Sequence, residues 1–181
     1  MALKKRSTST WMTPQQVILS RVDDARALLR HTLATLAYRA GKTLRGAPPS
    51  FADFRGGPGT RTPAEILAHM GDLLDWGLHL AQGHHIWQDS PPRPWDEEVA
   101  RFFAALRALD DFLATDERLG FLPGRLFQGP VADALWHAGQ LAMLRGMAGA
   151  PIRGENYFKA DIAVGRVGPD QPEPRAEFDG P

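Results

Sequence analysis

The sequence predicts an all-α protein, a four-helix bundle, and three observations support this. Four stretches repeat their apolar residues at intervals of three and four, the period of an amphipathic helix. Each stretch opens on a helix start signal. No stretch shows the alternation of polar and apolar residues that is typical of a strand. Helices of about 18–28 residues, with no sheet to cover, bury their apolar faces against one another.

The first two helices begin with the same signal. Thr13 and Thr62 are each followed by a proline, and Gln16 and Glu65 stand three positions after the threonines, which is the pattern of a capping box. The predicted apolar stripes and their glycine stops are Ile18 to Leu36 with Gly41, and Ile66 to Leu80 with Gly83.

The last two helices have different start signals. Acids at 96–98 suit the positive end of a helix dipole, so we expect the third helix to begin there. Pro130, after Gly129, has the residue type preferred at the first helical position, so the fourth helix is predicted to start at Pro130 and to stop at Gly149.

The connections refine the topology. Residues 84–95 form a proline-rich loop of twelve that spans about 40 Å when extended, more than the ~30 Å length of a twenty-residue helix. This loop can therefore cross the bundle and let the second and third helices run parallel. The 42–61 connection is also long. We expect 1–12 to be a disordered tail, 13–168 to be the bundle with a C-terminal segment packed on it, and 169–181 to be disordered.

Composition excludes several classes of protein. The 181 residues suit one domain, and no cysteine is present, which excludes disulfides, cysteine-based metal sites and thiol nucleophiles. Positive and negative side chains number 21 each, so we expect no nucleic-acid partner. No run is apolar enough for a transmembrane helix, and no apolar segment of a signal peptide follows the basic start. We expect no membrane association and a cytoplasmic location.

Two of the six histidines stand on predicted core stripes, an expensive place for an unpaired imidazole. These are His69 and His137, and Asp133 precedes His137 by one helical turn. Two side chains at this spacing share a helix face and can hold one ion. With His69 across the groove, two histidines and a carboxylate would form a set known from catalytic zinc and non-haem iron sites. The alternative is a buried Asp–His hydrogen bond without metal. The other four histidines (His31, His79, His84 and His85) we expect to be solvated or locally bonded.

The stretches 62–70 and 133–141 resemble the DinB/YfiT-like family of metal-binding four-helix bundles. Members typically carry one histidine in the second helix and an H-x-x-x-H pair in the fourth, followed by any residue, glycine and glutamine. Their second-helix histidine falls on His69, and Gly139 and Gln140 place the last histidine of the pair on His137. The first histidine of the pair falls on Asp133, a departure that leaves the identity of the metal open.

The resemblance implies an up-down-down-up helix order, a homodimer, and one divalent ion per chain. Zinc or nickel is the first expectation, with iron or manganese as further candidates. Characterised relatives include metal-dependent transferases of low-molecular-weight thiols and a thiol-dependent isomerase. The same ligands would serve a thiol S-transferase or a hydrolase, so the sequence does not choose between them. A non-catalytic or stress-related bundle, with a structural or metal-free site, is the alternative function.

Four residues are candidates for support of this site. Asp72 is spaced to orient the His69 ring, and Gln140 is spaced to hydrogen-bond within the core near His137. Trp76 and Trp136 can line a pocket. The alternatives are a surface acid for Asp72 and core packing for the tryptophans. A structural site would be closed by a fourth protein donor, such as Glu155.

Overall fold

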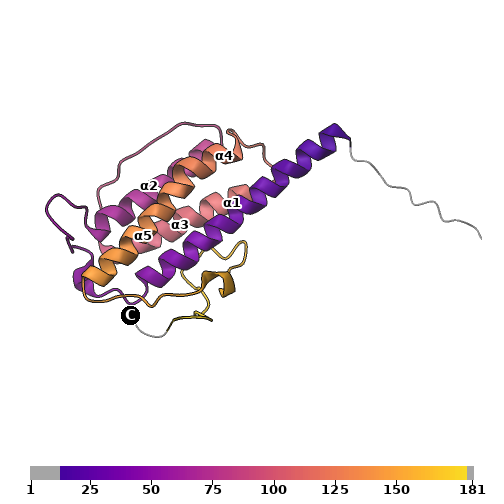
Figure 1. The fold of residues 1–181 in the computed structure, drawn as a ribbon. Helices are drawn as coiled ribbons and strands as arrows, with labels where there is room; N and C mark the ends of the chain where they lie inside the picture. Colours follow the sequence, from indigo (N-terminus) through magenta and orange to yellow (C-terminus); the bar gives the residue numbers. More distant parts are fainter. Residues whose placement is uncertain (1–12, 179–181) are drawn as a thin grey trace, which may run out of the picture.

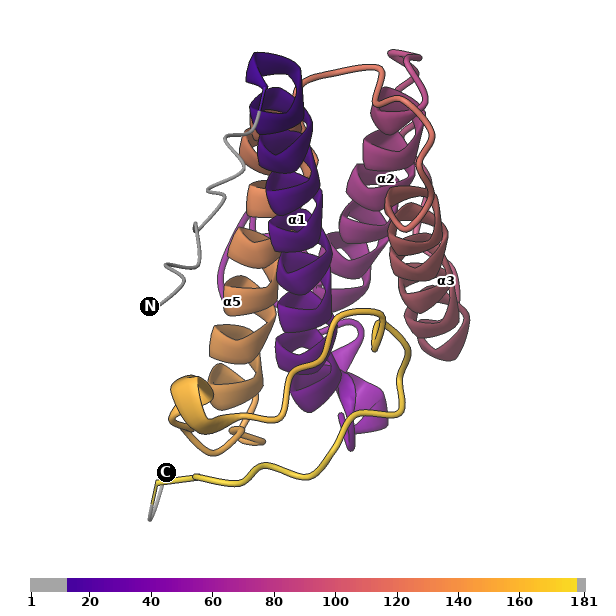
Figure 2. The same ribbon diagram turned by 90° about the vertical axis from the view of Figure 1, so that its right-hand side faces the viewer.

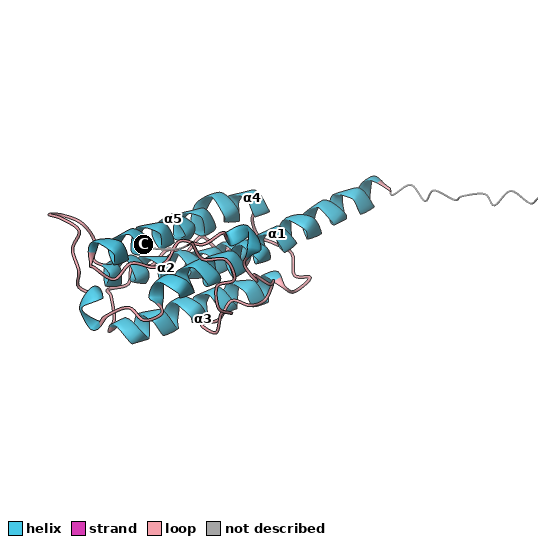
Figure 3. Ribbon diagram, turned by 60° about the horizontal axis from the view of Figure 1, so that its bottom comes forward, coloured by secondary structure: helices cyan, strands magenta, loops and turns pink. Residues whose placement is uncertain are grey.

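The computed structural model describes residues 13–178, of which 14–22 are described by their backbone alone. Four long helices lie side by side (Figures 1 and 2), and their bounds are α1 (Pro14–Leu44), α2 (Pro63–Ala81), α3 (Trp95–Leu113) and α5 (Ala132–Met147). Within 13–178 there is no strand (Figure 3), only an isolated bridge between Glu155 and Glu177. The all-α prediction is therefore confirmed. The expected tail at 1–12 lies outside the described residues, as do 179–181. None of the described helices is both long and apolar enough to cross a bilayer.

Helix α2 begins where its predicted cap places it. The Thr62 hydroxyl accepts from the Glu65 backbone N–H at 3.2 Å, and the Glu65 carboxylate accepts from the Thr62 N–H at 2.7 Å. These reciprocal bonds satisfy two N–H groups that the first turn leaves unpaired. At the other end Gly83 has a φ of 92°, the left-handed conformation that glycine adopts without strain. For α1, the Gln16 side chain lies outside those described.

The helical turns that lead into α5 begin before the predicted start at Pro130, although α5 itself begins at Ala132. Pro123 opens a short helix, α4 (Pro123–Leu126), which continues through a π turn, η2 (Phe127–Val131), into α5. Pro130, predicted at the first helical position, lies inside this π turn. A proline removes a backbone N–H and crowds the preceding turn, and the wider π turn accommodates both effects. Two further short helices are η1 (Pro49–Phe51) and η3 (Tyr157–Lys159).

Contacts between α2 and α3 advance in the same direction along both helices. Paired positions, from the start of α2 to its end, are Ala68 with Arg101, Gly77 with Leu109, and Ala81 with Gly120 just beyond α3. The segment between the helices runs back along the outside of the bundle (Figure 1). The core between the helices is aliphatic and aromatic, and its fully buried members include Leu33, Leu36, Leu67, Met70, Leu74, Phe102, Leu106 and Leu141.

The C-terminal segment packs on the bundle further than predicted. Residues 169–178 were expected to be disordered, yet Glu177 pairs with Lys42 of α1 at 2.7 Å, and Arg45, directly after α1, donates to the Gln171 carbonyl at 3.2 Å. The Asn156 N–H donates to the Ala176 carbonyl at 3.0 Å, and the Phe178 N–H donates to the Gly154 carbonyl at 2.9 Å. Backbone pairing of this kind is independent of side-chain polarity, so the polar composition of the segment did not reveal it.

The buried side chain of Arg101 links α2, α3 and the segment between them, residues 82–94, which we call the crossover. Arg101 donates to Asp72 at 2.8 Å and to Glu98 at 2.9 Å. Both carboxylates also accept backbone N–H groups of the crossover, Asp72 from Ser90 and Glu98 from Arg93, each at 2.9 Å. Gly71 leaves room for the guanidinium, because a Cβ there would lie 2.8 Å from its central carbon.

Replacing Arg101 with methionine should destabilise the fold strongly. The change leaves two buried carboxylates without their cation, so we expect the free energy of unfolding to fall by about 3–5 kcal/mol. Urea titration followed by circular dichroism measures this. Arg107→Met alters an exposed arginine of the same helix and should shift stability by no more than about 0.5 kcal/mol. Equal losses in the two variants would contradict the role given to Arg101.

Candidate metal centre

The structure brings together the three residues that the sequence singled out as metal ligands. His69 comes from α2, and Asp133 and His137 lie one turn apart on α5. Their ligand atoms all lie within 4.8 Å of one another. One Asp133 oxygen is 3.6 Å from His137 Nε2, and the other is 3.8 Å from His69 Nε2. The two imidazole rings meet edge to face, with centroids 4.8 Å apart.

These separations fit a shared ion better than a metal-free network. Hydrogen bonds to nitrogen span about 2.7–3.2 Å, so both carboxylate–imidazole distances are too long. Two donors that bind one zinc ion tetrahedrally at ~2.0–2.2 Å lie about 3.4 Å from each other. Two neutral imidazoles and one carboxylate are also a donor set that zinc, nickel, iron and manganese accept. A small inward movement of the side chains would complete the ligation.

A hydrogen bond fixes which nitrogen of His137 faces Asp133. His137 Nδ1 lies 2.8 Å from the Gln140 side-chain oxygen, which can only accept. The ring proton therefore sits on Nδ1, and Nε2 keeps its lone pair toward the carboxylate. The predicted contact of Gln140 with this histidine is thus present, and it is the contact that orients ligating histidines in metal sites.

His69 is held in its neutral form. Burial lowers the pKa of its imidazole, and the neighbouring His137 and Arg61 lower this pKa further. The Asp133 carboxylate opposes the shift. A neutral imidazole is the form that binds a metal, so His69 can ligate at neutral pH without first losing a proton.

The crossover places an aromatic side chain against the site. Trp87 meets the His69 ring edge to face at 5.7 Å and meets Trp76 at the same distance. His85, from the same segment, also meets the Trp76 ring edge to face, at 5.7 Å. Trp87 was not among the residues predicted for the site. The sequence feature that could have indicated it is a tryptophan in a long proline-rich loop, because tryptophan rarely stays in solvent without a partner.

Two hollows border the ligand cluster, one at His137 and the other at Asp133. One of about 420 Å³ is lined by Thr60, Arg61, Ile66, His137, Gln140, Met143 and Leu144. The other, of about 320 Å³, is lined by Trp76, Gln128, Gly129, Ala132, Asp133 and Trp136. Both predicted tryptophans therefore border a hollow beside Asp133. Trp136 is 71% exposed, so core packing is the wrong reading for it.

Two other sequence expectations need correction. Asp72 is neither a surface acid nor the hydrogen-bond partner of His69, because its two oxygens accept from Arg101 and from the Ser90 backbone. Helical spacing placed it on the correct face but did not reveal the arginine opposite. Glu155 is buried elsewhere, where it accepts from Tyr38 at 2.7 Å and from Lys42 at 3.0 Å. It therefore does not close the site, and residues 13–178 hold no other cluster of three such donors.

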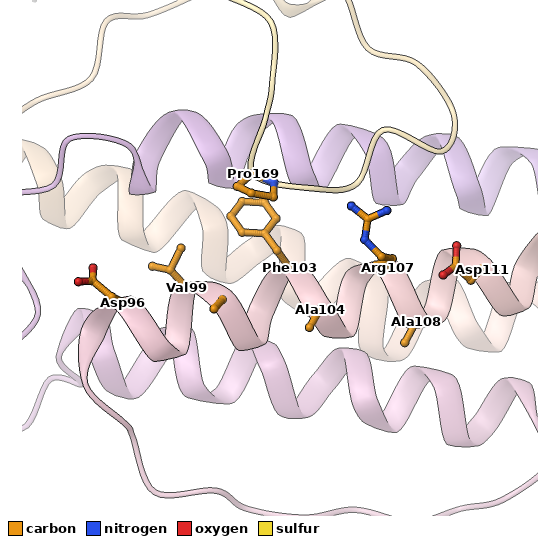
Figure 4. A pocket seen from close by; sticks show the side chains of 9 residues that line it. Asp96, Val99, Phe103, Ala104, Arg107, Ala108, Asp111 and Pro169 are labelled. Atoms are coloured by element: carbon orange, nitrogen blue, oxygen red, sulfur yellow. The ribbon is translucent and has the colours of Figure 1, made fainter.

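A larger hollow contains none of the three candidate ligands. It measures about 670 Å³ and lies along α3 (Figure 4), where Val99, Phe103 and Pro169 contribute apolar walls and Asp96, Arg107 and Asp111 contribute charged ones. No histidine lines it, so it lacks the donor set found at His69, Asp133 and His137.

Comparison with known proteins yields no match, whether to a family model, to a curated protein or to a solved structure. The DinB/YfiT-like resemblance therefore rests on the two sequence motifs alone.

Gln140→Leu should weaken metal binding while leaving the fold intact. The change removes the acceptor that orients His137, and the loss of such partners typically costs about 10–100-fold in metal affinity. Competition with a chromophoric zinc chelator measures the affinity. Gln82→Leu changes an exposed glutamine at the end of α2 that lines neither hollow, and it serves as the control. Unaltered affinity in Gln140→Leu would contradict the orienting role.

Proposed function

We propose that this chain is a metal-dependent enzyme of the DinB/YfiT-like class, with one divalent ion held by His69, Asp133 and His137. The observation that carries the proposal is the convergence of these three side chains from two helices, at separations suited to one ion. The motif offsets support it independently. Zinc or nickel is the expected ion, with iron or manganese as further candidates.

The reaction that this site suits best is transfer of a low-molecular-weight thiol, with hydrolysis as the second reaction of the same ligand set. When bound, a divalent ion lowers the pKa of a coordinated thiol or water toward neutrality. His69 and His137 supply neutral donors. The side-chain oxygen of Gln140 accepts from His137 Nδ1 and so orients the His137 ring. Asp133 is half exposed, so the ligand cluster opens to solvent on its side. With Glu155 engaged elsewhere, three protein donors leave a position for an exogenous group.

Several finer expectations belong to the same proposal. An up-down-down-up bundle is supported by the parallel advance of contacts along α2 and α3 and by the crossover between them. The homodimer and the cytoplasmic location stay predictions from the resemblance and the composition. The competing function is a non-catalytic or stress-related bundle, in which the site is structural or holds no metal.

Protein purified without an affinity tag should bind one divalent ion per chain. We expect His69→Ala and His137→Ala to abolish this binding, because each removes a direct ligand. Metal analysis after dialysis and calorimetric titration with zinc and nickel measure the stoichiometry. His79→Ala, a histidine on the same helix as His69, should bind as the unaltered protein does. Full retention of metal by the His69 and His137 variants would overturn the proposal.

The Co(II)-substituted protein should report an exchangeable coordination position. We expect its visible spectrum to change on titration with millimolar 2-mercaptoethanol or azide, because a three-donor site leaves room for either ligand. A spectrum indifferent to both ligands would favour the structural alternative, and failure to bind Co(II) or zinc at all would favour the metal-free one.

A further inference from the structure

Arg61 is a cation beside the candidate metal centre without a partner among the described residues. It lies directly before the cap of α2 and lines the same 420 Å³ hollow as His137. No hydrogen bond or ion pair joins its side chain to residues 13–178. Arg55, in the same connection, is by contrast engaged with the Thr60 carbonyl at 2.6 Å and with the Glu65 carboxylate at 3.4 Å. Arg61 thus keeps all five guanidinium N–H donors available to a ligand.

The charge of Arg61 lies at a hollow that the candidate ligand His137 also lines. None of the seven residues that line the hollow is acidic. An anion entering this hollow therefore meets a positive potential without a competing carboxylate on its walls.

The other residues that line the hollow indicate the chemistry of the rest of the ligand. The Gln140 oxygen is occupied by His137, which leaves the amide N–H groups of Gln140 as donors. The Thr60 hydroxyl already donates to the Gly57 carbonyl at 2.8 Å. Ile66, Met143 and Leu144 supply an apolar wall. The hollow therefore offers hydrogen-bond donors at its polar side and apolar surface beside them.

We propose that this hollow binds a carboxylate-bearing small molecule, with Arg61 as the anchor of the carboxylate. A carboxylate matches a guanidinium with two parallel hydrogen bonds, and a short apolar chain covers Ile66 and its neighbours. Because His137 borders the same hollow, the far end of such a ligand reaches the metal ligands. The inference rests on the proposed function and specifies it: the thiol substrate carries a carboxylate a few bonds from its sulfur.

The test compares two thiols that differ at one group, a charged carboxylate in the first and its neutral methyl ester in the second. Co(II)-loaded full-length protein is titrated with 3-mercaptopropionate and with its methyl ester, and half-saturation is read from the visible spectrum. We expect the acid to bind about tenfold more tightly than the ester, and the preference to shrink as salt rises. In Arg61→Gln the acid should bind no better than the ester, while ester binding stays unchanged and the protein still loads one Co(II) ion. Arg125→Gln, another exposed arginine, should keep the preference.

The outcomes separate this inference from the proposed function. Equal binding of acid and ester by the unaltered protein, or a preference that survives Arg61→Gln, would overturn the anchor and leave the metal site standing. If no metal binds, the proposed function fails, and a metal-free experiment decides on the anchor. Butyrate is then titrated while the side-chain amide resonances of Gln140 are followed by NMR. Saturable shifts that vanish in Arg61→Gln support the carboxylate site, and their absence in the unaltered protein rejects it.

Discussion

The buried guanidinium of Arg101 is the interaction on which the geometry of the candidate site depends. It pairs with both Asp72 and Glu98, and these carboxylates in turn hold the backbone of the crossover. The crossover carries Trp87 onto His69. Buried charges are tolerated only when they are paired and their remaining hydrogen-bonding capacity is used, and here each carboxylate accepts one bond from the guanidinium and one from a backbone N–H. The aromatic contact at the site is therefore secured by charges that do not themselves touch the metal ligands.

The distances among the three candidate ligands also depend on how closely α2 and α5 approach each other. Asp133 and His137 keep their separation because one helical turn fixes it, but the distance to His69 is set by packing between helices. Gly77 permits α2 to approach the π turn before α5, and α3 as well, since a Cβ there would lie 3.3 Å from Pro130 and 3.1 Å from Leu109. The π turn that contains Pro130 ends directly before α5 and so sets the register of Asp133. Turns of this kind are frequent at functional sites because they rotate the residues that follow.

Much of this could be read from the sequence, and the failures share one physical cause. Periodicity and capping located the helices and placed the three ligands on core faces, because both signals are local. What a residue meets across the bundle is not local. Asp72 found an arginine on α3, Glu155 found Tyr38 and Lys42, and Trp87 reached the site only through the return of the crossover. The start of the last helix was misplaced because proline at a first helical position and proline within a π turn leave the same trace in a sequence.

Charge links the two proposals. In the proposed site the two imidazoles would bind the metal through neutral nitrogens, so Asp133 alone would offset the charge of a divalent ion, and the loaded site would keep a net positive charge. Arg61 adds a second cation at the edge of this site. In a partly desolvated site, such charge attracts anions more strongly than it would in water. A thiol that also bears a carboxylate can bind both positive centres at once, with its thiolate at the proposed ion and its carboxylate at the Arg61 guanidinium. The neutral ligand pair and the unpartnered arginine thus point to the same kind of molecule, a short doubly anionic one, and a site closed by a fourth carboxylate donor would have removed half of that attraction.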